Sequence, residues 1–189
     1  MKTKTIALII AFAAIAIVLN PRFGLTIPVF YMPSTSLQYQ FFEIPIVAAL
    51  LLLGFKSGMT VAVLNTTAMV FLYPGTLFLY AAGNLLAATS LMVGVYLAVR
   101  LYESRAGCAA HFKGTRVVVF STALGILFRV LAMAFFWYGI VYMFYPDPSH
   151  TVFLVLPLQA IFNSTLPLYT VPIAYFVART IHKNLKIFN

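Results

Sequence analysis

The chain has 189 residues, of which 63% are hydrophobic and 8% are charged, and its mean hydropathy is +1.01. A soluble domain carries about 45–50% apolar and about 25% charged residues, so the composition excludes a water-soluble globule. Twelve lysines and arginines face three acids, a formal charge of +9. A chain this apolar has no polar face on which a basic groove could form. We therefore exclude nucleic acid as the partner. The sequence predicts an all-α, multi-pass protein of the cell membrane.

Six apolar segments are predicted along the chain, judged against the roughly 20 residues that a spanning helix needs. They are residues 5–19, 42–55, 58–72, 77–101, 117–144 and 152–177. The first also fits a signal peptide, but the apolar character continues far beyond any cleavage site. The second and third are short, and Lys56-Ser57 separates them. They form either brief tilted helices or a hairpin that enters part of the way, within one transmembrane domain over residues 1–189.

Residues 20–41, between the first two segments, are rich in Pro, Thr, Ser, Gln and aromatic residues. We predict a long loop here. Loops of more than about 12–15 residues without secondary structure are uncommon and often serve as lids. Tyr39 is one of its aromatic residues, and we expect the loop to close over a bound molecule. The alternative is disorder.

The basic residues predict the orientation of the chain. With six spans and a cytoplasmic N-terminus, ten lysines and arginines fall on the cytoplasmic side and only Arg22 falls in an outer loop. The ten are Lys2, Lys4, Lys56, Arg100, Arg105, Lys113, Arg116, Arg179, Lys183 and Lys186. Because cytoplasmic loops are enriched in Lys and Arg, both termini are predicted to be cytoplasmic, with residues 20–41 and 145–151 outside.

Polar side chains at membrane depth are costly, so their positions indicate function. Glu43 lies at the predicted outer start of the second segment. Asn65, Asn84 and Gln159 each lie roughly 10 Å below the outer end of their own segments at 1.5 Å per residue, and Asn163 is one turn below Gln159. The inner halves are mostly apolar, which indicates a substrate pocket open to the outside. The alternative is that these amides only bond helices together, at about 0.6 kcal/mol each.

Arg129 is predicted near mid-membrane in the fifth segment, where a cation must pair, reach the interface or face water. No acid lies within a helical turn of it in the sequence. Its predicted roles are to cap backbone carbonyls of a helix broken near Pro157 or Pro167, to contact an electronegative group of a ligand, or to snorkel. Trp137 lies in the aromatic stretch that follows. It either stacks on a flat ligand or belongs to an interfacial aromatic belt.

The sequence has no glycine-rich phosphate loop, no His/Cys metal cluster and no paired membrane carboxylates. We therefore predict no metal, no cofactor and no enzymatic activity. Without a phosphate loop the chain cannot hydrolyse ATP by itself. Six short spans are also few for a self-contained secondary transporter.

The chain resembles the substrate-binding S-components of energy-coupling factor (ECF) vitamin transporters. The resemblance rests on its size, six segments with both ends inside, a long outer loop after the first segment, and an Ala-rich first segment. Residues 42–45 (Phe-Glu-Ile-Pro) and 54–58 (Gly-Phe-Lys-Ser-Gly) are similar to the second helix and its turn in that family. These stretches, Asn84 and residues 156–163 are most similar to the riboflavin-binding branch.

The resemblance implies a binding subunit that takes up a vitamin from outside, closes the first loop over it and releases it inside. The implied partners are membrane lipid, a membrane T-subunit and two ATPase subunits that drive import with ATP. The family's Ala-x-x-x-Ala surface, which contacts the T-subunit, corresponds to Ala7 and Ala11. Small residues four apart allow such close helix approach.

Riboflavin is the first expected ligand, because Asn84, Gln159 and Asn163 can each donate and accept hydrogen bonds to a ring edge. Arg129 has no evident counterpart in the flavin-binding branch. It favours a ligand with a carboxylate or a carbonyl-rich ring. The alternatives are therefore an S-component for a carboxylated vitamin, or a membrane enzyme acting on lipid or prenyl substrates.

Overall fold

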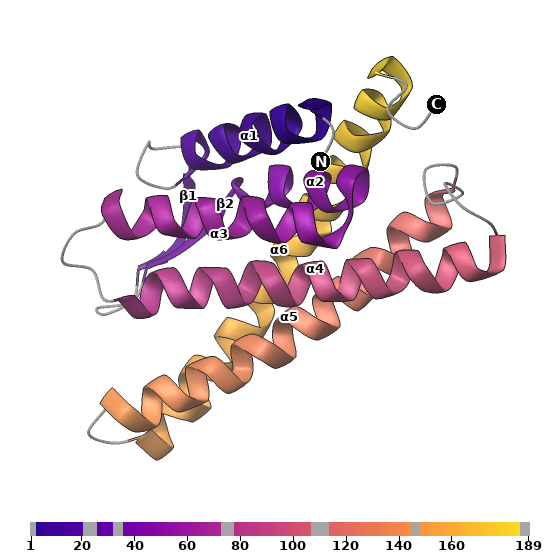
Figure 1. Ribbon diagram of the computed structural model, residues 1–189. Helices are drawn as coiled ribbons and strands as arrows, with labels where there is room; N and C mark the ends of the chain where they lie inside the picture. Colours follow the sequence, from indigo (N-terminus) through magenta and orange to yellow (C-terminus); the bar gives the residue numbers. More distant parts are fainter. Residues whose placement is uncertain are drawn as a thin grey trace.

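The computed structural model describes residues 3–20, 26–31, 36–72, 78–106, 114–144 and 148–185. These residues form six α-helices and a two-stranded antiparallel sheet (Figure 1). The elements are α1 (Thr3–Val18), β1 (Thr26–Tyr31), β2 (Ser36–Gln40), α2 (Glu43–Leu53), α3 (Phe55–Leu72), α4 (Phe78–Ala106), α5 (Thr115–Phe144) and α6 (Pro148–Leu185). The prediction of an all-helical membrane chain with six helices is confirmed.

Successive helices run in alternate directions, so that α1 begins and α6 ends at the same end of the molecule (Figure 1). We call this the inner end. Six exposed basic side chains lie there, namely Lys4, Lys56, Arg100, Arg116, Arg179 and Lys183. Their placement agrees with a cytoplasmic inner end. Lys2, Arg22, Lys113 and Lys186 lie outside the described residues.

Large apolar side chains cover the outward faces of the long helices. Phe135, Phe153 and Phe176 are each more than two thirds exposed, at 78%, 80% and 72%. A soluble protein would hide so much contiguous apolar surface, whereas lipid covers it in a membrane. Within the described residues, three helices are long and apolar enough to cross the bilayer alone, over Phe78–Ser104, Thr115–Ile140 and Val155–Asn184.

Helix α2 is the centre of the bundle. It contacts α1, α3, α4 and α6, and only Ile44 and Leu53 of its residues are not buried. A helix surrounded by protein is apolar on every side. Its 11 residues rise only about 16 Å, about half of the roughly 30 Å hydrocarbon core. The prediction that the second segment is short is confirmed, whereas α3, with 18 residues, is near spanning length.

Gly54 makes the turn between α2 and α3. Its φ angle is 89°, and its N–H donates to the Leu50 carbonyl at 2.9 Å. Residues with a Cβ rarely adopt such an angle, so glycine is suited to a turn this tight. The predicted break at Lys56-Ser57 is therefore wrong, since both residues lie in the first turn of α3.

The ends of the long helices also differ from the predicted segments. Helix α4 continues to Ala106, and α6 extends from Pro148 to Leu185, beyond residues 152–177 at both ends. Proline is tolerated in the first turn of a helix, where its missing N–H has no partner to lose. The apolar runs marked the membrane-embedded part of each helix and not where the helix ends.

Residues 20–41 are not a loop without secondary structure. Strands β1 and β2 pair antiparallel, from Thr26 opposite Gln40 to Tyr31 opposite Ser36, with an irregularity between Pro28 and Phe30. The β-branched and aromatic residues here favour strands, and a two-stranded sheet has only edge strands, which accept a proline. The prediction of a loop was therefore wrong, because it took the prolines as evidence against strands. Residues 21–25 and 32–35 lie outside the described residues.

Helices α4 and α5 approach closely at Gly94 and Gly125. A Cβ on Gly94 would lie 2.5 Å from the Leu124 carbonyl oxygen and 2.8 Å from the Gly125 Cα, so the two backbones would have to separate. We expect Gly94→Ala to lower the free energy of unfolding by about 1–3 kcal/mol, as overpacking does. Thermal unfolding in detergent measures it. Gly139→Ala is the matched control, because a Cβ there meets nothing within 4 Å; equal stability of the two variants would contradict the prediction.

Candidate functional site

Arg129 and Glu43 form a buried ion pair between α5 and α2. Arg129 Nη1 donates to Glu43 Oε2 at 2.6 Å, and the two side chains are 4% and 1% exposed. Arg129 is at the middle of α5. Since α2 is too short to reach the outer surface from its turn at Gly54, its first residue lies at mid-depth. Glu43 therefore lies deeper than predicted, and the pair neutralises a charge that is otherwise very costly in the bilayer.

The ion pair corrects two predicted roles of Arg129. Its guanidinium does not cap backbone carbonyls near Pro157 or Pro167, because its hydrogen bonds go to the side chains of Glu43 and Asn163. It does not snorkel either, because the residue is only 3% exposed. Contact with a ligand stays a prediction.

Helix α6 extends the ion pair into a polar network. Arg129 Nε donates to Asn163 Oδ1 at 3.0 Å. Asn163 Nδ2 in turn donates to the Gln159 carbonyl at 2.8 Å and to Gln159 Oε1 at 3.2 Å. Four predicted site residues from three helices are thus brought together and all are buried. The amide of Asn163 has partners on both its oxygen and its nitrogen, so it holds the Arg129 side chain in place.

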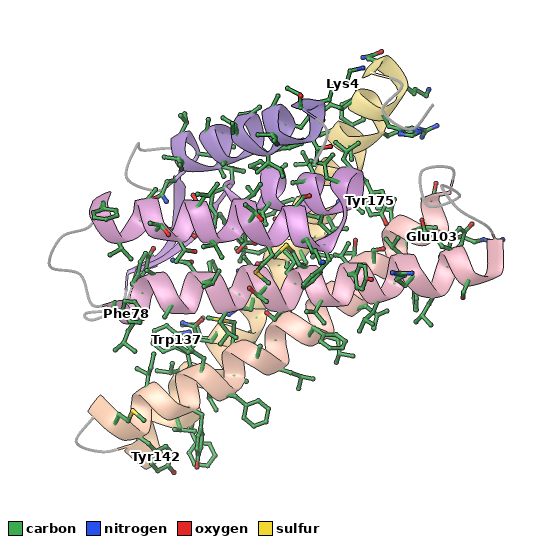
Figure 2. The ribbon with its side chains drawn as sticks, viewed as in Figure 1. Lys4, Phe78, Glu103, Trp137, Tyr142 and Tyr175 are labelled. Atoms are coloured by element: carbon green, nitrogen blue, oxygen red, sulfur yellow. The ribbon has the colours of Figure 1, made fainter. Side chains whose placement is uncertain are left out.

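Among the described residues, the hydrogen bonds of Asn65 and Asn84 and the ring contact of Trp137 are with their own helices and not with this network. Asn65 is buried in α3, and its Nδ2 lies 3.7 Å from Met69 Sδ on the same helix. Asn84 is half-buried, and its Nδ2 donates to the Tyr80 carbonyl at 3.1 Å, also on its own helix. Trp137 lies on α5 and is labelled in Figure 2. Its ring meets that of Phe136 edge to face, with centroids 6.3 Å apart.

Strand β2 is docked against α6 and α4. The Tyr39 hydroxyl is 2.8 Å from Thr165 Oγ1, and its ring centroid is 5.5 Å from that of Phe162. The Tyr169 hydroxyl donates to the Gln40 carbonyl at 2.7 Å. Gln40 Nε2 also donates to the Tyr80 hydroxyl on α4 at 3.1 Å. The hairpin is therefore held in place three residues before Glu43.

The sequence prediction included Tyr39 but missed its partners on α6. Phe162, Thr165 and Tyr169 are spaced three and four apart, which places them on one helical face. This spacing is a signal for a docking face. The sequence alone could therefore have suggested that this face of α6, next to Asn163, binds another segment of the chain.

Several buried polar atoms have no hydrogen-bond partner within the described part of the chain. They include Glu43 Oε1, Asn65 Oδ1 and Trp137 Nε1, all from predicted site residues, and also Thr170 Oγ1. Native proteins pair nearly all such atoms, and an unpaired one costs about 1–3 kcal/mol. Of these atoms, Glu43 Oε1 belongs to the polar network, and it leaves a place there for a hydrogen-bond donor.

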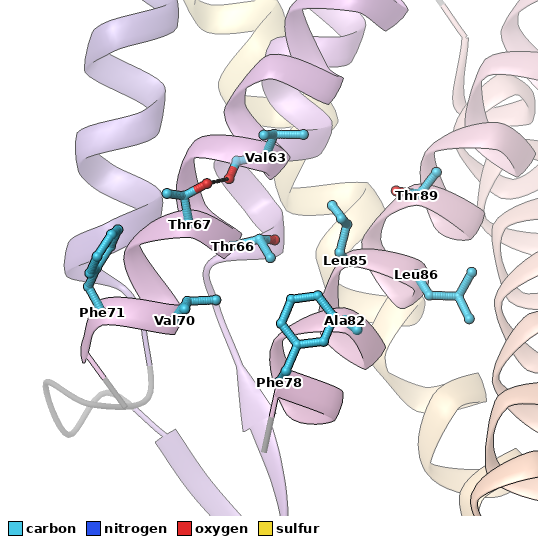
Figure 3. A pocket seen from close by; sticks show the side chains of 10 residues that line it. All are labelled: Val63, Thr66, Thr67, Val70, Phe71, Phe78, Ala82, Leu85, Leu86 and Thr89. Carbon is cyan, nitrogen blue, oxygen red and sulfur yellow. Dashed lines mark hydrogen bonds between the residues drawn. The ribbon is translucent and has the colours of Figure 1, made fainter. Parts of the chain in front are cut away.

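An apolar groove of about 590 Å³ lies elsewhere, between the outer parts of α3 and α4 (Figure 3). Its lining residues are Val63, Thr66, Thr67, Val70, Phe71, Phe78, Ala82, Leu85, Leu86 and Thr89. The hydroxyls of Thr66 and Thr67 donate within α3, to the carbonyls of Ala62 and Val63, both at 2.9 Å. The groove differs from the predicted polar pocket, because most of its lining is hydrocarbon and its three hydroxyls have partners, that of Thr89 being Met59 Sδ on α3 at 3.9 Å.

The described part of the chain holds no group of three or more His, Cys, Asp or Glu side chains placed to bind a metal ion. Glu43 is the acid within the polar network, and one of its oxygens already accepts a hydrogen bond from Arg129.

No protein-family model matches the sequence, and no curated protein matches it. The structure is similar to a solved structure of the S component of a bacterial ECF transporter, with a TM-score of 0.75. The match covers 98% of this chain and 99% of that chain at 17% sequence identity. The chain therefore has the six-helix membrane fold of an ECF S component, and the predicted likeness in fold is confirmed over nearly its full length.

Proposed function

We propose that this chain is the substrate-binding subunit of an ECF-type vitamin importer and not an enzyme. The observation that carries the proposal is the buried polar network of Glu43, Arg129 and Asn163 beside a docked hairpin, with Glu43 Oε1 unpaired among the described residues. Charged and polar side chains buried at mid-membrane are costly, and they usually mark a functional site. The S-component fold supports a binding function for it.

The hairpin β1–β2 serves as the lid in this proposal. Its contacts with α6 and α4 are hydrogen bonds and ring contacts of Tyr39 and Gln40. Polar contacts of this kind exchange with water, so the hairpin can lift and dock again. Because β2 ends three residues before Glu43, lifting the hairpin exposes the polar network to the outside, and docking it closes the site over a bound molecule.

Riboflavin is the first candidate substrate. The positive charge of Arg129 would favour a carboxylated vitamin, but Glu43 already neutralises that charge. That objection to an uncharged ligand no longer holds. Riboflavin is uncharged, its ring edge both donates and accepts hydrogen bonds, and its flat ring suits contacts with Tyr39 and Trp137. Asn84, Asn65 and Gln159 are the further proposed contacts.

The runner-up, a membrane enzyme acting on lipid or prenyl substrates, has less support. An acid or histidine would have to act at the membrane interface. Glu43 is buried at mid-depth and paired with Arg129, which removes it from that role.

The proposed partners are a membrane T-subunit and two ATPase subunits. Helix α1 buries Ile9, Phe12, Ala13 and Ala16 against the bundle. Ala7 and Ala11 lie on its exposed side. Small exposed residues four apart let another helix approach closely, and this supports α1 as the docking face for the T-subunit.

The single tryptophan of the chain, Trp137, allows a direct binding test. The purified protein in lipid nanodiscs is titrated with riboflavin and with a panel of other vitamins, following tryptophan fluorescence and thermal unfolding. We expect one vitamin to change the fluorescence saturably and to raise the unfolding temperature. Trp137→Phe should lose the fluorescence signal and, because Trp137 is a proposed ligand contact, should show a smaller thermal shift with the same ligand. If no vitamin changes either measurement, the proposed function is wrong.

A further inference from the structure

The two oxygens of the Glu43 carboxylate have different surroundings. Oε2 accepts from Arg129 at 2.6 Å, whereas Oε1 is buried and has no hydrogen-bond partner within the described residues. A buried carboxylate oxygen accepts hydrogen bonds and cannot donate them while ionised. The group that completes this site must therefore bring a hydrogen on nitrogen or oxygen.

The charge of Arg129 is already matched by the charge of Glu43. Two of the five guanidinium N–H groups are engaged, one on Nη1 with Glu43 and the one on Nε with Asn163. The ion pair is electrically neutral, so a carboxylate placed beside Oε1 would add a second negative charge to the first in a buried site. Like charges at such short distance disfavour each other strongly, and the cost of removing the carboxylate from water is added to that.

We propose that the substrate is an uncharged or cationic vitamin without a carboxylate, which donates a hydrogen bond to Glu43 Oε1. This inference rests on the proposed function and adds the substrate class and its specificity-determining residue. Glu43 selects for donors and against acids, while Arg129, Asn163 and Gln159 hold the Glu43 side chain in position. Trp137 Nε1, a buried donor without a partner in the described chain, is suited to a carbonyl of the same ligand.

The first arm of the test uses the unmodified protein in nanodiscs. Riboflavin, thiamine, pyridoxine and nicotinamide form one group of probes, and biotin, pantothenate, folate and nicotinate form the carboxylated group. We expect the tightest ligand to come from the first group, and nicotinamide to bind no more weakly than nicotinate. A tightest ligand from the carboxylated group would overturn the inference but leave the proposed function standing. If none of the eight binds, the proposed function itself fails.

The second arm changes Glu43 alone. In Glu43→Gln the amide oxygen turns to the Arg129 donors, so the amide nitrogen, a donor, faces the ligand's donor. We expect the affinity for the ligand found in the first arm to fall at least tenfold, and its preference over carboxylated probes to shrink. Glu103→Gln, an acid-to-amide change at the inner end of α4, is the control and should keep the affinity. Unchanged affinity in Glu43→Gln would overturn the inference; if that variant does not fold, the first arm decides.

Discussion

Arg129→Met is expected to destabilise the protein by about 3–5 kcal/mol, because it leaves the carboxylate of Glu43 buried without its partner. The two side chains are 4% and 1% exposed, so water cannot replace the lost contact without opening the bundle. Denaturant or thermal unfolding in detergent micelles measures the change. Arg116→Met is the matched control at the exposed start of α5, where substitutions change stability by about 0.5 kcal/mol or less.

The double variant Glu43→Leu/Arg129→Met separates the ion pair from general packing. Replacing both members of a buried pair by apolar residues of similar size is often neutral. We expect the double variant to recover most of the stability that Arg129→Met loses, and to bind no vitamin. A double variant less stable than the single one would show that Arg129 stabilises the bundle through other contacts.

Ala11→Trp is expected to reduce ATP-dependent uptake at least tenfold in the assembled transporter, while ligand affinity of the isolated subunit stays within about twofold. Ala11 is exposed on α1, and a bulky ring there prevents close approach of a partner helix. Ala7→Trp should act in the same way. Uptake into vesicles and fluorescence titration of the purified subunit measure the two quantities.

Ala123→Trp is the control for this surface. Ala123 is exposed on α5, away from α1 in the contacts of the bundle. We expect uptake to be kept in this variant, because a bulky residue facing lipid obstructs nothing. Loss of ligand binding in isolated Ala11→Trp protein, or equal loss of uptake in Ala123→Trp, would contradict a partner surface on α1.

The helices and their orientation were predictable because they follow local rules. About 20 apolar residues mark a span wherever they occur, and basic residues mark the cytoplasmic side. The inner end of the bundle carries Lys56, Arg100 and Arg179 as these rules require. Neither rule depends on which helices become neighbours.

The ion pair was not predictable from the same rules. Glu43 and Arg129 are 86 positions apart, and the depth of Glu43 was estimated as if the second helix began at the outer surface. Helix α2 instead lies inside the bundle with only 11 residues, which lowers its first residue to the depth of Arg129. A run that is apolar on all sides, with no lipid-facing stripe, was the available sign that α2 is central.

The sequence analysis named the residues of the polar network but did not predict which of them bond to one another. Gln159 and Asn163 are one turn apart, so their contact follows from helix geometry. The bond from Arg129 to Asn163 joins α5 and α6, whose relative rotation depends on how their side chains pack. Local spacing gives no information on that rotation.

We propose that this chain captures a vitamin for an ATP-driven importer. The most direct measurement is uptake of radiolabelled vitamins, riboflavin first, into vesicles that contain this chain, a T-subunit and two ATPase subunits. We predict uptake of one vitamin that requires both ATP and this chain, and that an excess of the unlabelled vitamin abolishes. Uptake of every vitamin at the level of vesicles that lack this chain would contradict the account.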